Sequence, residues 1–264
     1  MAVPPPPESS SGESKGIMIS RGVTPSFPPG ALSFFRGPDG TLQSDARLHL
    51  RFDVCPVWLE ISLDHLQRAE REHQNLIVAW RDQKSDEAAL AMESEFRAGV
   101  QATASACIAL DAFYANVREY IPIPEEMQRG WLKKKNSRAF QLAEVLRRGF
   151  TMKTDTADRV RDIVKQIYDF RDLAIHPSGK TKEAVLHPDL QVGVEWRFIS
   201  FGFTNVKEVV AGCLSLVAQL VEKPKPNLSE LVFYCTGVRP NLGPVVASWE
   251  AHYGILFKRA GSAP

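Results

Sequence analysis

The sequence predicts a mainly α-helical protein, a helical bundle with a small N-terminal β-hairpin and peripheral extended segments. Apolar residues recur at a spacing of three to four over several long stretches, which is the period of a helix with one buried face. One of these stretches is rich in small residues, which allow helices to pack closely. Prolines and glycines fall between the periodic stretches and indicate where helices end.

The composition and net charge limit the classes of protein to which the chain can belong. The 264 residues are 44% hydrophobic and 24% charged, as in a water-soluble globular chain. A formal net charge of +1 argues against a protein that coats nucleic acid over its whole surface, but it leaves room for a local basic patch.

Neither a disulfide framework nor a metal site is expected. The four cysteines are widely spaced and form no Cys-x-x-Cys or Cys/His cluster, so we expect reduced, buried thiols. No basic-then-apolar signal peptide opens the chain, and no apolar run reaches the roughly 20 residues that span a bilayer. We therefore expect a cytoplasmic protein with no membrane partner and no cofactor.

Two segments are expected ahead of the bundle. Residues 1–30 are rich in proline and serine and poor in apolar residues, so they predict a disordered tail. Residues 31–56 predict a β-hairpin appendage, in which the stretches 31–43 and 46–54 supply two short strands around the turn at residues 37–40. Apolar and polar residues alternate through the second strand, giving it one face of each kind.

Two long helices are expected next, at about residues 56–81 and 86–120. The first has a polar middle, residues 64–73, where we expect it to fray or bend. The second begins with acidic residues, which the helix dipole favours, and its small residues predict the central helix of a bundle. Asp111 interrupts its apolar face. A buried carboxylate needs a partner, so Asp111 either pairs inside the bundle or faces solvent.

Prolines 122 and 124 end that helix, and a basic connection follows. Trp131 could serve as a stacking platform for an RNA base, and Lys133, Lys134 and Lys135 could contact phosphate. The alternative is that the three lysines form a solvated loop.

The second half of the chain predicts three more elements and an appendage. Helices are expected at residues 139–148, from residue 154 or 155 to about 175, and at 205–222. Residues 192–203 are rich in β-branched and aromatic side chains and predict a strand or extended segment. The sequence Lys-Pro-Lys-Pro stops the last helix, and residues 223–264 predict a C-terminal appendage packed on the bundle.

The candidate catalytic residues lie at the end of the helix that closes near residue 175. Arg171 and Asp172 are followed by three apolar residues, then His176 and Pro177. An imidazole exchanges protons readily near neutral pH, and a guanidinium can hold phosphate oxygens in a fork. Because the residue before a proline is biased away from helix, His176 is expected to leave the last turn.

This pattern resembles the HEPN superfamily, whose hallmark is an arginine, a polar residue, a few mostly apolar residues and a histidine. The alanine-rich helix with its acid, Asp111, is similar to the family's small-residue helix, and the resemblance covers about residues 57–222. It implies a metal-independent endoribonuclease in which His176 is the general acid/base, Arg171 binds phosphate and Asp172 orients them. It also implies a homodimer that brings two motifs together, and a role as a toxin with a cognate antitoxin or in phage defence.

A second pair with the same spacing exists, and a structural explanation of the first remains open. Arg68 and His73 are also five residues apart, but charged residues fill the interval, so the pair predicts an exposed helix face. For the first pair, Arg171 could instead clamp the bundle by pairing with Asp111 or Asp172, and His176 could cap helix carbonyls. The alternative function is therefore a catalytically inactive helical module that binds RNA or protein.

Overall fold

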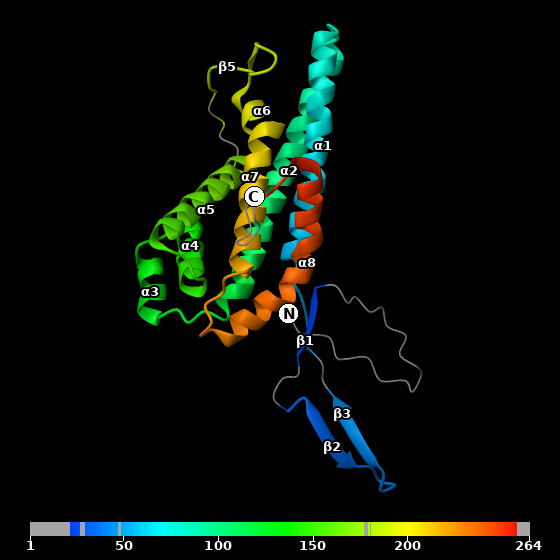
Figure 1. The fold of residues 1–264 in the computed structure, drawn as a ribbon, viewed down its shortest axis with the longest axis vertical. Coiled ribbons are helices and arrows are strands. Elements are labelled where there is room, and N and C mark those ends of the chain that lie inside the picture. The colour runs from blue at the N-terminus through cyan, green and yellow to red at the C-terminus, as the bar shows by residue number, and fades with distance from the viewer. Residues whose placement is uncertain (1–21, 27–29, 47–48, 177–178, 180, 258–264) are drawn as a thin grey trace. The chain divides into compact units, whose positions relative to one another are not determined.

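A computed structural model describes residues 22–26, 30–46, 49–176, 179 and 181–257, and most of these residues are helical (Figure 1). The chain divides into two compact units, residues 1–51 and 52–264. The mainly helical fold class with a small N-terminal hairpin is confirmed. Most of the predicted tail lies outside the described residues.

The N-terminal unit contains short β-ladders. Strands β2 (Leu32–Arg36) and β3 (Leu42–Ala46) form an antiparallel hairpin, with Phe34 opposite Ser44, around a turn in which Gly40 has a φ of +82°. Strand β1 (Val23–Ser26) pairs with β4 (His49–Phe52). Two predictions are corrected: the hairpin closes within residues 32–46, and part of the predicted tail is a strand because β4 offers it a pairing edge.

Helices α1 (Cys55–Arg81) and α2 (Ser85–Arg118) form the long axis of the helical unit and lie side by side (Figure 1). The middle of α1 does not fray as predicted. Leu66 and Ala69 are fully buried against the bundle, whereas Arg68 between them is exposed. Burial on one face therefore keeps this stretch helical despite its polar composition.

Helix α2 is central, as its small residues predicted. It packs against α1 and α7 (Phe203–Val221) and also contacts α4 (Arg138–Gly149), α5 (Thr154–Ile175) and α6 (Trp196–Ser200). Gly99 marks a very close approach, because a Cβ built there would collide with the carbonyl oxygen of Phe201. Only a glycine lets that backbone come so close to the helix.

Three shorter helices follow: α3 (Glu125–Lys133), α4 (Arg138–Gly149) and α5 (Thr154–Ile175). The predicted basic connection is thus itself helical over residues 125–133, starting directly after Pro124. The side chain of Ser137 caps α4 by accepting a hydrogen bond from the backbone N–H of Phe140 at 3.3 Å.

After α5 the chain forms a small ladder and two helices. Strands β5 (Val185–Leu186) and β6 (Gly193–Val194) pair antiparallel, and they precede α6 (Trp196–Ser200) and α7 (Phe203–Val221). The prediction of an extended segment at residues 192–203 is therefore wrong beyond β6. In α6 the carboxylate of Glu195 accepts the N–H of Arg197 and starts a helical turn.

Helix α7 is the one helix among the described residues long and apolar enough to cross a membrane by length and composition. In this fold the apolar face of α7 is buried in the protein core. Val206, Val210, Cys213 and Val217 are buried in the main core, which α7 shares with α2 and α8.

The sequence predicted an appendage packed on the bundle at residues 223–264, but the described part of this stretch, residues 223–257, belongs to the bundle itself. Residues Ser229–Tyr253 form one helix, α8, with Pro240 and Pro244 inside it and a bend visible in Figure 1. The missing N–H groups of these prolines weaken the helix locally. Burial of Leu231, Leu242 and Trp249 in the main core compensates, so α8 is part of the bundle.

The four cysteines are buried free thiols, as predicted, one each in α1, α2, α7 and α8. Burial raises the pKa of the Cys107 thiol to about 12, and it raises the pKa of the Cys235 thiol to about 12 as well. These thiols are therefore poor nucleophiles in the folded protein.

Candidate functional site

Helix α5 presents the predicted motif at its C-terminal end. Arg171 and Asp172 lie near the C-terminal end of the helix, and His176 follows the last helical residue with a φ of −116° and a ψ of 73°. Its backbone N–H still donates to the carbonyl oxygen of Asp172 at 2.9 Å. His176 thus leaves the helix, as expected for a residue that precedes a proline.

The guanidinium of Arg171 lies between two carboxylates. Its Nη1 is 3.6 Å from Oδ2 of Asp111 on α2, and its Nη2 is 3.0 Å from Oδ1 of Asp172. The guanidinium carbon lies 4.8 Å from the ring centroid of Tyr168, one turn earlier on α5. The side chain remains 27% exposed, so it is oriented without being removed from solvent.

Asp111 is the centre of this cluster. Its Oδ1 accepts a hydrogen bond from the Tyr168 hydroxyl at 2.5 Å and another from Nε of Arg138 at 3.2 Å. Of the two alternatives for Asp111, pairing is the one observed, with the carboxylate half-buried. Because its partners come from α4 and α5, one carboxylate of α2 joins three helices.

Sequence reasoning missed Arg138 and Tyr168. The guanidinium carbon of Arg138 lies 4.0 Å from the ring centroid of Tyr114, a geometry that favours a cation. Burial lowers the pKa of Arg138, but the hydrogen bond to Asp111 and nearby charges raise it overall, so it stays charged. No spacing connects residue 138 with residue 111, so the signal was not in the sequence.

The formal charges of the cluster cancel. Arg138 and Arg171 bring two positive charges, Asp111 and Asp172 bring two negative charges, and the sum of these four is zero. Burial, together with the neighbouring Asp111, raises the pKa of Tyr168, which keeps its hydroxyl a donor. The arrangement orients Arg171 firmly, but a phosphate must compete with two carboxylates for it.

His176 is separate from these contacts. Its side chain is exposed, and its imidazole makes no hydrogen bond to any residue that the structure describes. Arg171 and His176 are therefore near one another along the chain without forming a joint hydrogen-bonded site. One copy offers an oriented arginine and a freely accessible imidazole.

The predicted RNA-binding residues divide into two groups. Trp131 is buried, with 6% of its surface exposed, because it belongs to the apolar face of α3 that packs on the core. It is not available as a stacking platform, and that prediction is corrected. Lys133, Lys134 and Lys135 are exposed at and beyond the end of α3, which fits either of the roles considered for them.

The prediction that the second Arg/His pair lies on an exposed helix face is also corrected. Arg68 is exposed as predicted, but the side chain of His73 is only 13% exposed and bonds to the buried Glu95 across to α2. A histidine within a charged stretch gave no sign of this contact, because its partner lies 22 residues away.

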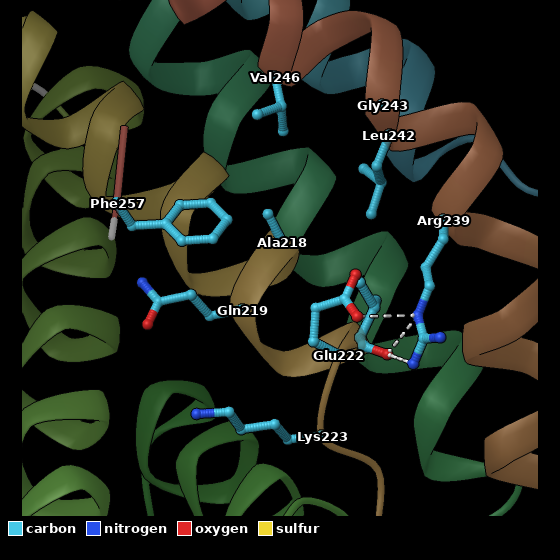
Figure 2. Close-up of a pocket in the computed structure, with 10 residues that line it drawn as sticks. Ala218, Gln219, Glu222, Lys223, Arg239, Leu242, Gly243, Val246 and Phe257 are labelled. Atoms are coloured by element: carbon cyan, nitrogen blue, oxygen red, sulfur yellow. Dashed lines mark hydrogen bonds and ion pairs between the residues drawn. The ribbon is translucent and has the colours of Figure 1, made fainter. Parts of the chain in front are cut away.

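A cavity of about 650 Å³ lies away from the motif, between α7, α8 and Phe257 (Figure 2). Ala218, Leu242, Val246 and Phe257 form its apolar wall. Its arginine, Arg239, donates to the carbonyl oxygen of Val221 and so caps the C-terminal end of α7. This cation thus has a structural role, and none of the motif residues reaches the cavity.

Within the described ranges no group of three histidine, cysteine or acidic side chains is arranged to hold a metal ion. No protein-family model, curated protein or solved structure matches the chain.

Proposed function

We propose that the protein is a metal-independent endoribonuclease of HEPN type, with RNA as substrate. One observation carries the proposal: Arg171 is held in an oriented, partly exposed position by Asp111, and an exposed His176 follows at the end of the same helix. An arginine fixed before substrate arrives costs little reorganisation when it binds a phosphate.

Each motif residue has a role in this reaction. His176 removes the proton of a ribose 2′-hydroxyl, whose oxygen attacks the adjacent phosphorus; the bond from phosphorus to the 5′-oxygen breaks, and that oxygen receives a proton. The products are a 2′,3′-cyclic phosphate and a 5′-hydroxyl. Arg171 binds the non-bridging oxygens, and Asp172 orients Arg171 through its 3.0 Å contact.

A dimer completes the proposed site. One chain supplies one accessible imidazole, whereas the reaction needs both a base and an acid. A second copy across a symmetric interface would supply the other. The exposed lysines 133–135 would then contact RNA beyond the cleaved bond. The proposal includes a cytoplasmic location and action as a toxin with a cognate antitoxin, or in phage defence.

RNA cleavage in EDTA tests the proposal. The wild-type protein should cleave RNA without added metal and leave 2′,3′-cyclic phosphate ends. His176→Ala and Arg171→Ala should lower the rate by at least about 100-fold, the usual contribution of general acid–base catalysis. His49→Ala, which removes an exposed histidine of β4, is the matched control and should cleave normally.

The proposal fails if folded wild-type protein and folded His176→Ala leave RNA equally intact. Circular dichroism at the assay temperature verifies the fold of each variant.

One observation favours a second candidate, the catalytically inactive helical module. Arg171 contacts both Asp111 and Asp172, which is also the arrangement of a clamp between α2 and α5. In that case Arg171→Ala would lower thermal stability, and the wild-type protein would bind RNA or a protein without cutting RNA.

A further inference from the structure

A group of four polar residues fastens the loop between β5 and β6 to the long helices. It comprises His73 of α1, Glu95 of α2, and His187 and Asp189 of the loop; we call these residues the histidine latch. Two of them, Glu95 and His187, are buried polar side chains, at 4% and 5% exposure. Such groups are stable in the interior only with partners.

Glu95 anchors the latch to the bundle. Its Oε1 accepts the backbone N–H of Phe203, the first residue of α7, at 2.7 Å. The same oxygen lies 3.1 Å from Nδ1 of His73. Nε2 of His73 is 3.6 Å from Oδ2 of Asp189. His73 thus lies between two carboxylates, and its doubly protonated form satisfies both.

The backbone around His187 favours the opposite protonation state, against the pull of the Asp189 carboxylate, whose Oδ2 lies 3.9 Å from Nδ1 of His187. The backbone N–H groups of Asp189 and Leu190 both point at its Nδ1, at 3.2 and 3.4 Å. A nitrogen that accepts hydrogen bonds must carry its lone pair, so the neutral imidazole is the form that closes the loop. The rings of His187 and His73 stack with centroids 6.5 Å apart, which further disfavours charge on both.

Other charged groups around the latch are few. Glu70 on α1 adds negative charge near His73, and it accepts a hydrogen bond from Tyr253 of α8. On α7 the ammonium of Lys207 lies 5.8 Å from the ring centroid of Phe203. The loop is also held by an apolar contact, because Leu190 is buried with Leu76 and Ala79 of α1 and residues of α2.

We propose that the histidine latch closes the β5–β6 loop onto α1 and α2 only within a window of pH, and that it loosens on both the acid and the alkaline side. The window exists because closure needs one histidine charged and its stacked neighbour neutral. This inference does not depend on the proposed function. The loop and His176 both belong to the segment that joins α5 to α6. Loosening of the loop would therefore act on the same segment as the candidate site.

The directions of titration agree with this geometry. The hydrogen bond to Glu95 raises the pKa of His73, so its contribution is complete below the ordinary value of about 6.5 and is lost as pH rises through the raised value. Burial lowers the pKa of His187, so its contribution is complete above about 6.5 and is lost as pH falls through the lowered value. Closure should be strongest near pH 6.5.

Hydrogen exchange of the full chain, read by mass spectrometry at about pH 5, 6.5 and 8 and corrected for intrinsic rates, tests the latch. Protection of residues 187–194 should be highest at the middle pH and should fall on each side, by about tenfold for each unit of pKa shift. Protection of α4 should not follow this pattern. A flat profile for the loop overturns the proposal.

Variants separate the two sides of this pH profile, which are the fall in loop protection toward acid (the acid limb) and the fall toward alkali (the alkaline limb). His187→Asn keeps an acceptor near the position of Nδ1 and should abolish the acid limb alone, whereas His73→Gln should abolish the alkaline limb alone. His65→Gln, elsewhere on α1, should leave both limbs unchanged. Persistence of both limbs in the double variant His73→Gln/His187→Asn overturns the proposal.

Imidazole NMR titration of the wild-type protein provides an independent measurement if a variant does not fold. His73 and His187 should titrate on opposite sides of about pH 6.5, and titration of both on the same side contradicts the latch.

Discussion

At the scale of single residues, Asp111 is the most connected polar group near the candidate site. It accepts hydrogen bonds from a tyrosine and an arginine and lies next to a second arginine, and these partners come from two other helices, α4 and α5. A half-buried acceptor with several donors matters for stability because its removal leaves each donor without a partner. Asp111 therefore affects both the orientation of Arg171 and the packing of α5.

We expect Asp111→Ala to lower the free energy of unfolding by about 1–3 kcal/mol, because the Tyr168 hydroxyl and Arg138 lose their acceptor. Urea denaturation followed by circular dichroism measures this. Asp158→Ala is the control: that aspartate is exposed and pairs with Arg161 one turn away, so its loss should cost under about 0.5 kcal/mol. If the two variants lower the free energy of unfolding equally, the hydrogen bonds of Asp111 do not contribute specially to stability.

At the scale of elements, two glycines distinguish close packing from helix propensity. Gly99 of α2 faces the backbone of Phe201, whereas a Cβ at Gly130 of α3 would meet nothing within 4 Å. Both lie inside helices, where alanine is intrinsically better than glycine.

We expect opposite effects from the same substitution at these positions. Gly99→Ala should destabilise the protein by about 1–3 kcal/mol, because a backbone carbonyl cannot move aside as a side chain can. Gly130→Ala should stabilise it by up to about 1 kcal/mol through helix propensity. Thermal unfolding of both variants measures the difference, and a stabilising Gly99→Ala would contradict the close approach of α6 to α2.

How much of the elements was predictable depends on where their partners lie. The spacing of apolar residues that marks a helix can be read within the helix itself. The sequence therefore predicted α1, α2, α4, α5 and α7 to within a few residues. Helix α8 was missed because Pro240 and Pro244 usually stop helices, and only burial of its apolar face overrides them. Helix α6 was missed because its aromatic residues favour strands in isolation.

The candidate site was predictable only in part for the same reason. Asp111 and the motif stood out by residue type and position. Arg138, the hydroxyl of Tyr168 and the latch around His73 required knowledge of which helices face each other. The burial of Trp131 likewise follows from the packing of α3, not from its basic neighbours.

At the scale of the molecule, the division into two units predicts independent folding of the larger one. Residues 52–264 contain every helix of the described chain and both clusters of buried apolar residues. A domain with its own core can fold alone.

We therefore expect the fragment 52–264 to be soluble, with the helical circular dichroism of the full chain and a melting temperature within a few degrees of it. The control is a fragment that ends at residue 222. It lacks α8, which packs against α7 and shares its buried core, so it should aggregate or melt without cooperativity. Similar melting of the two fragments would contradict the place of α8 in the core.

The four buried thiols have a consequence of their own. Each of α1, α2, α7 and α8 carries one cysteine that an alkylating reagent cannot reach until that helix separates from its neighbours. The native chain therefore contains four internal probes of opening, and none needs to be engineered. Cys235 lies before the proline bend of α8. Cys107 lies one turn before Asp111 on α2, and its thiol donates a hydrogen bond to the carbonyl oxygen of Ile167. The order in which the four react would rank the helices by how often each one opens.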